Sequence, residues 1–270
     1  MAETGDAVII EAANAVMTLT MNRPEVLNSM NGALMAGLKA GLVQAERGIA
    51  DGTVRAVVVT GAGRGFCAGA DLGDPAIRGQ DGMPAMDLGD YLRRHYHPLI
   101  EQMRTLPAPI IMAVNGSAAG AGMSLALAGD IVLAAQSATF LQAFSRIGLI
   151  PDAGSTYFLP RLAGESRARA MAILADKISA EQAMQFGMVW QVLPDDELRP
   201  AAVAMAQRLA TMPTRAFAFI KEALNQSLRN DLSRQLEVEA TLQSRAGKTE
   251  DFQEGVAAFL GKRKADFKGR

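Results

Sequence analysis

The segment from Gly148 to Pro160, GLIPDAGSTYFLP, contains one carboxylate, Asp152. It follows apolar residues and a proline that fixes the backbone. Ala153 to Leu159 has the pattern of a short helix that Pro160 would close. Asp152 is therefore expected on a loop at a helix N-terminus. There it could be a simple N-cap that accepts a hydrogen bond from a backbone N–H near Ser155. It could also move a proton as a general acid or base.

Two turns rich in glycine and alanine each follow an apolar segment that has the pattern of a buried strand. GAGRGFCAGADL (61–72) follows the expected strand 54–60, and NGSAAGAGMSLALAGD (115–130) follows the expected strand 109–114. Small residues let a backbone approach a ligand closely, and turns that enter helices direct unpaired N–H groups outward. One N–H group from each turn could bind the same carbonyl oxygen, as in an oxyanion hole. Tight packing of helices on a sheet would also produce such turns.

The strands and helices that must position the Asp152 loop and the two turns have the order of stacked strand–turn–helix units of an α/β protein. The hydrophobic pattern predicts strands at 8–10, 16–21, 54–60, 109–114, 131–134 and 189–193. It predicts helices at 31–47, 91–103, 153–159, 195–211, 213–228, 231–246 and 250–261, and one from a capping box at Ser179 and Gln182 to Gly187. Residues 73–89 show no period and are interpreted as a mobile loop.

Composition excludes several classes of protein. The chain has 270 residues, 49% of them hydrophobic, and a net charge of -1, which disfavours a nucleic-acid binder. A single cysteine, Cys67, and two histidines, His95 and His97, are too few for a disulfide or for most metal sites. There is no signal-peptide pattern and no apolar run of roughly 18 residues, so a cytoplasmic protein without a membrane span is expected.

Several motifs resemble one family, and they occur in the family's order. These are NRPEVLNSM (22–30), FCAGADL (66–72), VNGSAAGAGMSLAL (114–127), GLIPDAGSTYFLPRLAG (148–164) and FLGKRKADF (259–267). They resemble the crotonase superfamily, also called enoyl-CoA hydratase/isomerase. Within it, LIPD, the run at 179–192 and the C-terminal motif resemble the bacterial members that isomerise the epoxide of phenylacetyl-CoA.

The resemblance implies an α/β fold built as a crotonase-like spiral of ββα repeats with a C-terminal helical trimerisation region. It divides the chain into a core for coenzyme A binding and catalysis at 1–200 and an oligomerisation region at 201–270. The expected partners are an acyl-CoA substrate and further copies of the chain, as a homotrimer or as a hexamer of two trimers. No cofactor and no metal are expected, because coenzyme A is part of the substrate.

The resemblance also implies roles for individual residues. The backbone N–H groups of Ala68 and Ala121 would form the oxyanion hole. Residues from two loops, together with one apolar side chain, would bind substrate and coenzyme A: Arg23, Val26, Gly69, Ala70, Asp71, Leu72 and Phe144. Phe259 and Lys262 would reach the adenine and phosphates, from a neighbouring subunit.

Two departures from the family pattern bear on the reaction. Hydratases of the family use two glutamates, and the matching positions here hold Ser124 and Phe144. The remaining carboxylate is Asp152, at a position where several isomerases of the family place theirs. This implies an acyl-CoA isomerase that converts epoxyphenylacetyl-CoA to an oxepin, and that could also move a double bond from position 3 to position 2 of an enoyl-CoA.

Two other interpretations stay open. A hydratase would need a second carboxylate, for which the sequence offers only the loop residues Asp74, Asp81, Asp87 and Asp90. A non-catalytic subunit that binds coenzyme A is the other alternative. RNA-binding relatives are disfavoured by the net charge of -1.

Overall fold

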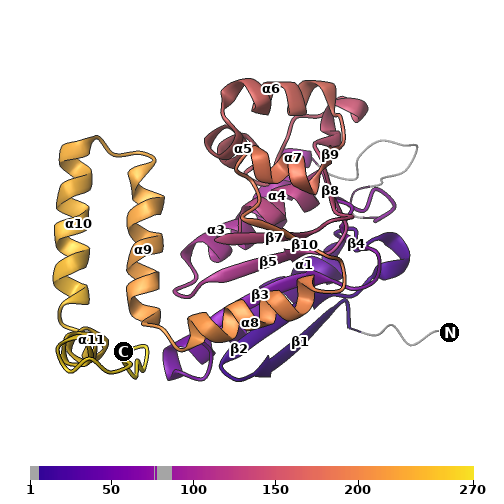
Figure 1. Cartoon of the computed structure of the whole chain (residues 1–270). Helices are drawn as coiled ribbons and strands as arrows, with labels where there is room; N and C mark the ends of the chain where they lie inside the picture. Colours follow the sequence, from indigo (N-terminus) through magenta and orange to yellow (C-terminus); the bar gives the residue numbers. More distant parts are fainter. Residues whose placement is uncertain (1–5, 76, 78–86) are drawn as a thin grey trace.

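The computed structural model of the protein describes residues 6–75, 77 and 87–270, with two sheets at its centre (Figure 1). The larger sheet has the strand order β1-β2-β3-β5-β7-β10, and the smaller has the order β4-β6-β8-β9. The strands of the larger sheet are Val8–Ala13, Val16–Met21, Ala56–Gly61, Ile110–Val114, Ile131–Ala135 and Gln191–Leu193. Those of the smaller sheet are Gly65–Cys67, Ser117–Ala119, Thr139–Leu141 and Ile178–Ser179.

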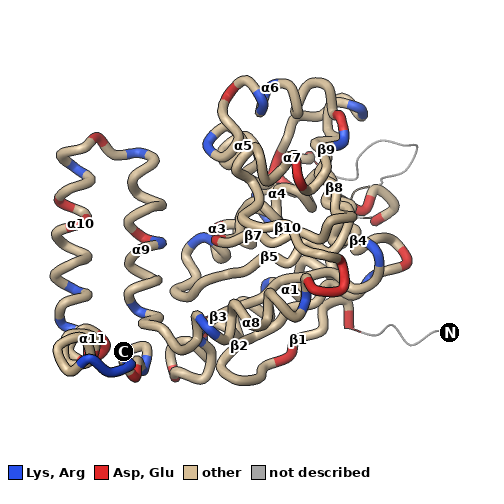
Figure 2. The backbone as a smooth tube through the Cα atoms, in the orientation of Figure 1, with Lys and Arg blue, Asp and Glu red and all other residues tan. Residues whose placement is uncertain are grey.

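The middle strands of the larger sheet are apolar because neighbouring elements bury them. β3, β5 and β7 pair in parallel and carry no charged residue along their length (Figure 2). Every residue of β5 is buried. A parallel strand that is covered on both faces has no polar side, so its sequence shows a continuous apolar run instead of alternation. The prediction of such a strand near residues 54–60 is thus confirmed.

The chain passes three times from the larger sheet to the smaller sheet and then into helices. β3 and β4 lead to α2 (Leu88–Tyr91), η3 (Leu92–Tyr96) and α3 (His97–Thr105). β5 and β6 lead to α4 (Ala121–Leu127), and β7 and β8 lead to η4 (Ala143–Ile147) and α5 (Ser155–Ala163). This repeat confirms the predicted spiral of ββα units. The sequence does not predict β4, β6 or β8, because three residues are too few to show a period.

Local sequence signals fix several of the helices. α1 (Gly32–Asp51) is capped by Asn31, whose Oδ1 accepts the Leu34 N–H at 2.9 Å. Its buried face includes the predicted stripe of Leu34, Leu38 and Leu42. α6 spans Glu165–Leu174. α7 (Ala180–Gln185) begins with the predicted capping box, in which Ser179 and Gln182 bond each other's backbone N–H groups.

The C-terminal helices α9 (Thr214–Ser227), α10 (Leu232–Ala246) and α11 (Glu250–Leu260) stand beside the body of the molecule (Figure 1). They have a small hydrophobic cluster of their own, made of Phe219, Val238 and Leu242. α9 is fixed to the body by the buried Lys221, whose Nζ lies 2.7 Å from Asp130 Oδ2. α8 (Leu198–Ala210) crosses the predicted boundary at residue 200 and packs on β3 and β5. The division of the chain into a catalytic core and an oligomerisation region stays a prediction.

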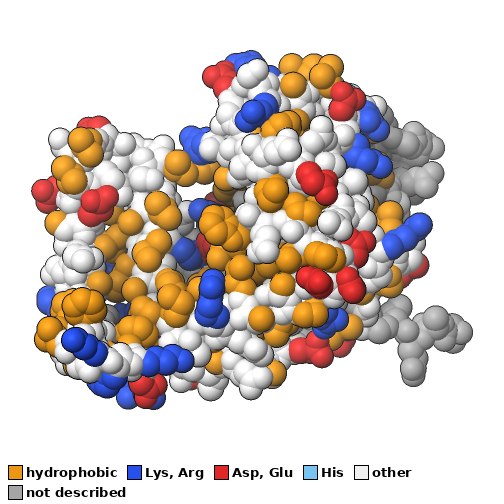
Figure 3. Space-filling model, in the orientation of Figure 1, with side chains coloured by type: hydrophobic (Ala, Val, Ile, Leu, Met, Phe, Trp, Pro, Cys, Tyr) orange, Lys and Arg blue, Asp and Glu red, His pale blue; other side chains and the backbone are white. Residues whose placement is uncertain are grey.

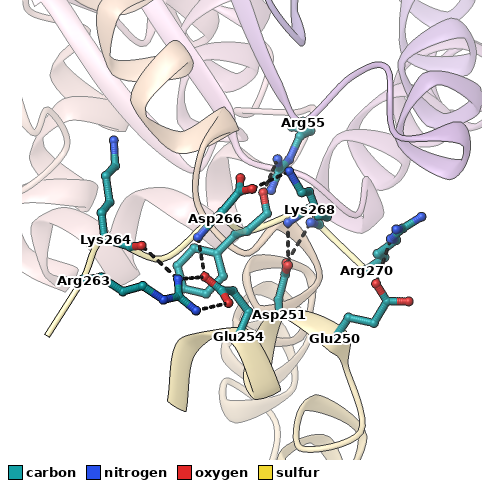
Figure 4. A network of polar contacts seen from close by, with 11 residues as sticks. Arg55, Glu250, Asp251, Glu254, Arg263, Lys264, Asp266, Lys268 and Arg270 are labelled. Atoms are coloured by element: carbon teal, nitrogen blue, oxygen red, sulfur yellow. Dashed lines mark hydrogen bonds and ion pairs between the residues drawn. The ribbon is translucent and has the colours of Figure 1, made fainter. Parts of the chain in front are cut away.

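The basic C-terminal segment folds back on the protein (Figure 4). Arg263 forms an ion pair with Glu254 at 2.6 Å, and the Asp251 carboxylate accepts the backbone N–H groups of Lys268 and Gly269. Arg55 holds the end of the segment by donating to the Phe267 carbonyl at 2.9 Å. Much of the positive charge in this segment is therefore used within the chain. No helix of the described residues is both long and apolar enough to cross a membrane.

Candidate active site

Asp152 lies on the loop between η4 and α5, but its carboxylate does not cap the helix. α5 begins at Ser155, its N-cap is Gly154, and no side chain caps it. Asp152 contributes only its backbone carbonyl, which accepts the Ser155 N–H at 2.9 Å. The N-cap interpretation is therefore wrong, and the carboxylate is left for another role.

The predicted end of this helix is wrong as well. α5 continues through Pro160 to Ala163, because buried residues on both sides of the proline keep the helix packed on its neighbours: Leu159 and Ala163. The helix ends where Gly164 adopts a φ of +82°, in the left-handed region that favours glycine.

The carboxyl group of Asp152 is poorly solvated. The residue is half-buried, and its Oδ1 is fully buried without a hydrogen-bond partner among the described residues. Burial disfavours the charged form and raises the pKa of Asp152 to about 6. A carboxyl group with a pKa close to neutral pH can both accept and return a proton, which suits general acid–base catalysis.

A chain of buried hydroxyl and amide groups holds the backbone of Asp152 in place. Gln142 Nε2 donates to Ser155 Oγ at 2.8 Å, Ser155 Oγ lies 3.0 Å from Ser124 Oγ, and Ser124 Oγ donates to the Asp152 carbonyl at 2.9 Å. The next residue, Ala153, has a φ of +47°, which is strained for a residue with a side chain. Ser124, which the family resemblance matches to a hydratase glutamate, therefore supports Asp152 through its backbone.

The two turns rich in glycine and alanine meet, as the sequence predicts. Gly69 has a φ of +93°, and a Cβ atom at this position would lie 2.7 Å from the Ala119 carbonyl oxygen and 3.4 Å from the Ala121 nitrogen. Gly122 packs equally tightly against the Cys67 carbonyl. Only glycine allows this close approach of the two backbones.

The free N–H groups of the two turns are not the pair that the resemblance implies. The Ala68 N–H donates to the Leu27 carbonyl at 3.0 Å, so the assignment of Ala68 as an oxyanion donor is wrong. Two residues later, the Ala70 N–H has no partner within the described chain, and Ala121 is the first residue of α4, where N–H groups have no partner within the helix. Ala70 and Ala121 are therefore the candidate donors.

The loop at 22–30 and the first turn are joined as expected for one binding channel. Arg23 forms an ion pair with Asp71 at 2.9 Å and donates to the Ser29 carbonyl at 2.6 Å. Burial of Asp71 opposes its ionisation, but hydrogen bonds from Arg23 and Gly73, together with the Arg23 charge, hold its pKa below the ordinary value. Beside this pair, Val26 and Leu72 are 38% and 56% exposed and could contact a ligand.

Three other residues that the resemblance places in the site lie as follows. Phe144 is buried at the second turn, where its ring would lie 3.8 Å from a Cβ atom on Gly120. Phe259, at the end of α11, and Lys262, just beyond it, lie on the opposite side of the molecule from β4 (Figure 1). One chain alone therefore does not bring Phe259 and Lys262 to the first turn, which follows β4.

The loop carboxylates that a hydratase might recruit have structural partners. Asp74 accepts the Gly32 N–H at 3.1 Å, Asp87 accepts the Asp90 N–H at 2.9 Å, and Asp90 forms an ion pair with Arg93 at 2.6 Å. Asp81 lies outside the described residues. Within the ranges 6–75 and 87–270 and at residue 77, no group of three His, Cys, Asp or Glu side chains could hold a metal ion.

Comparisons with known proteins identify the family of this chain. The chain is 49% identical to 1,2-epoxyphenylacetyl-CoA isomerase of Escherichia coli (strain K12), over 97% of this chain and 98% of that protein. It is 47% identical to a Rhodobacter capsulatus protein named "Probable enoyl-CoA hydratase", over 96% and 97%. The crystal structure of enoyl-CoA hydratase from Bacillus anthracis superimposes with a TM-score of 0.88 at 32% identity, covering 98% of this chain and all of that one. The family model for enoyl-CoA hydratase/isomerase matches residues 11–270, and the chain belongs to this family.

Proposed function

We propose that this enzyme is an acyl-CoA isomerase whose substrate is epoxyphenylacetyl-CoA and whose product is the ring-expanded oxepin-CoA. The observation that carries the proposal is the Asp152 carboxyl group, which is half-buried, has an unpartnered oxygen and has a pKa raised to about 6. The two positions that hold glutamates in hydratases are occupied here by Ser124, which supports the Asp152 loop, and by an apolar ring, Phe144. Among the described residues of the site, Asp152 is therefore the carboxylate proposed for proton transfer.

In the proposed mechanism, the thioester oxygen accepts hydrogen bonds from the N–H groups of Ala70 and Ala121. These donors stabilise negative charge on that oxygen when Asp152 removes the proton next to the carbonyl. The protonated Asp152 then returns the proton at another carbon, so a 3-enoyl-CoA becomes a 2-enoyl-CoA with no atom gained or lost. With the epoxide, Asp152 removes the proton next to the carbonyl and the same donors stabilise the resulting enolate. The carbon–carbon bond shared by the epoxide and the six-membered ring then breaks to give the seven-membered oxepin ring, and Asp152 returns the proton to a ring carbon, so no atom is gained or lost. The reaction consumes no cofactor, because coenzyme A is part of the substrate.

Hydration of an enoyl-CoA is the second candidate function, and the similarity to the Rhodobacter capsulatus protein favours it. A hydratase needs one group to position water and another to move a proton. The partners of Asp74, Asp87 and Asp90 within the chain count against these residues as the missing group.

The decisive experiment compares wild type with Asp152→Asn on three thioesters: enzymatically generated epoxyphenylacetyl-CoA, a 3-enoyl-CoA and crotonyl-CoA. Isomerisation leaves the mass unchanged and is followed by absorbance and chromatographic retention, whereas hydration adds the mass of water. We expect isomerisation by wild type and its loss in the variant. Addition of water to crotonyl-CoA without isomerisation of either other thioester would refute the proposal in favour of the hydratase.

We further propose that the active form is a homotrimer or a hexamer of two trimers. Many large apolar side chains are exposed on α9, α10 and α11, and hydrophobic atoms cover much of this face (Figure 3): Leu224, Leu228, Leu232, Leu236, Phe252 and Phe259. A patch of this kind marks a protein interface more often than a free surface. In such an assembly Phe259 and Lys262 would extend toward coenzyme A bound to a neighbouring subunit. Light scattering tests this, because it should give three or six times the chain mass of 28.5 kDa.

A further inference from the structure

The side chain of Asn28 joins the loop at 22–30 to the start of the first turn. Asn28 is 0% exposed. Its Nδ2 donates to the Gly65 carbonyl at 2.8 Å and to the Ala62 carbonyl at 2.9 Å, and its Oδ1 accepts the Arg23 N–H at 2.8 Å. Both amide hydrogens and the amide oxygen therefore have partners. A buried polar group that is satisfied in this way makes the segments it joins rigid.

The backbone at this point of the loop is strained. Leu27 has a φ of +51° and Asn28 a φ of +56°, both in the left-handed region. Asparagine tolerates this region, but a bulky residue such as leucine is an outlier there. Such strain persists only where the surrounding structure enforces it, and it is frequent at functional sites. Here the strained backbone brings the Leu27 carbonyl to the first turn, where it accepts the Ala68 N–H at 3.0 Å.

The next hydrogen bonds between the loop and the first turn lie on either side of Ala70. The Met30 N–H donates to the Gly69 carbonyl at 2.7 Å, and the Met30 carbonyl accepts the Asp71 N–H at 3.0 Å. Met30 and Ala70 thus form a parallel β-bridge. In this pattern the residues before and after Ala70 make the hydrogen bonds to the loop, so the N–H of Ala70 itself points away from the loop.

We propose that Asn28 is a positioning residue for the oxyanion hole. It holds the loop and the first turn in register, so that the Ala70 N–H is the one left free and reaches the thioester oxygen together with the Ala121 N–H. The second turn lies close by, because a Cβ atom on Gly69 would be 3.4 Å from the Ala121 nitrogen. The inference rests on the proposed function, since it concerns the acyl-CoA site, and it requires no contact between Asn28 and the substrate.

The test measures how strongly the protein polarises a bound thioester carbonyl. Phenylacetyl-CoA with ¹³C at the carbonyl has no double bond or epoxide to rearrange, and infrared difference spectra give its carbonyl stretching frequency. Hydrogen bonds to the oxygen weaken the C=O bond, so binding to wild type should lower this frequency. Asn28→Gly should lose about half of the shift, because one of the two donors is misplaced. Glycine adopts a φ of +56° without strain, so the variant removes only the side-chain contacts.

Asn28→Asp is the second variant. It keeps the size of the side chain and an oxygen to accept the Arg23 N–H, but it lacks the amide group that donates to the Gly65 and Ala62 carbonyls. It should lose a similar part of the carbonyl shift. In both variants kcat for isomerisation should fall about 10²-fold with little change in KM, because the free N–H is displaced from the oxygen that becomes charged.

The matched control is Asn31→Ala, three residues further along the chain. Asn31 caps α1 by accepting the Leu34 N–H at 2.9 Å, so its loss should lower the Tm but leave the carbonyl shift and kcat at wild-type values. Asn28 variants with a lower Tm and the full wild-type carbonyl shift would assign Asn28 to the fold alone and overturn the inference. A wild type that does not shift the carbonyl frequency would overturn it too. The spectra require no turnover, so a failure of the proposed function would appear separately, as absence of isomerisation by wild type.

Discussion

Replacing Asp152 by asparagine removes a charge from a half-buried position and leaves the size of the side chain almost unchanged. Burial raises the pKa of this carboxyl group from 3.8 to about 6. Because each pKa unit corresponds to about 1.4 kcal/mol, ionised Asp152 destabilises the folded protein by up to roughly 3 kcal/mol. The sign follows from proton binding. The folded state binds the proton more tightly than the unfolded state, so the stabilisation by the protonated form is complete below pH 3.8 and is lost as the pH rises through about 6.

Asp152→Asn should therefore be more stable than wild type at pH 8, by about 1 to 3 kcal/mol, and the difference should disappear near pH 4. At roughly 2 °C per kcal/mol for a chain of this size, the Tm at pH 8 should rise by about 2 to 6 °C. The same variant should lose a factor of about 10² to 10⁴ in isomerase activity, the usual contribution of a general acid–base group. In wild type, kcat/KM should fall as the pH drops below about 6, because only the ionised carboxylate removes a proton.

Thermal denaturation across this pH range and turnover of both isomerase substrates test the argument together. Asp71→Asn is the matched control, because Arg23 and Gly73 hold the pKa of Asp71 below its ordinary value and its replacement should lower the Tm at pH 8. A loss of stability in Asp152→Asn would show that the ionised carboxylate holds the fold together. Full activity in a folded Asp152→Asn protein would remove the residue from the mechanism.

Three further variants test the residues that support the candidate active site and the ion pair that fixes α9 to the body of the molecule. Ser124→Ala removes the hydroxyl that donates to the Asp152 carbonyl, so kcat should fall about 10-fold with KM unchanged, as steady-state kinetics would measure. Gly69→Ala introduces a Cβ atom at a φ of +93° and against a carbonyl oxygen, so it should cost about 2 kcal/mol of stability and at least about 10-fold in kcat. Lys221→Met leaves Asp130 partly buried without its 2.7 Å partner, and chemical denaturation should show a loss of about 3 kcal/mol.

Control variants separate these effects from general damage. Gly32→Ala adds a methyl group where nothing lies within 4 Å, so it should leave kcat unchanged and should not lower the stability. Arg169→Met removes an exposed ion pair with Glu165 and should leave the denaturation midpoint unchanged. Unchanged kcat in Ser124→Ala or unchanged stability in Lys221→Met would contradict the roles assigned here.

Features that depend on residues close together in the sequence could be predicted from the sequence. The Asn31 cap and the Ser179–Gln182 capping box involve groups three residues apart, and the buried central strands follow from apolar runs. The spiral of ββα units and the family follow from motifs spread over the chain. Asp152 could be selected because it is the carboxylate left at a matched position when the hydratase glutamates are absent.

Other features depend on contacts between segments far apart in the chain. Ala68 and Ala70 look equally suited as donors in the sequence, but the loop at 22–30 comes alongside the first turn, and the Leu27 carbonyl takes the Ala68 N–H. In the same way, only the packing of α4 against the Asp152 loop turns Ser124 from an unexplained substitution into a support for the Asp152 carbonyl.

Asp152 shows most clearly which properties follow from the sequence and which depend on the fold. Its sequence context is compatible with a helix cap and with an acid–base group, and in a solvated loop its pKa would stay near the ordinary value. The structure instead starts α5 at Ser155 and buries the carboxylate without a partner for Oδ1. The sequence alone determined which residue carries the charge. The tertiary structure decided how that charge is solvated, because the surrounding residues that exclude water come from distant parts of the chain, and the desolvation raises the pKa toward the range useful for proton transfer.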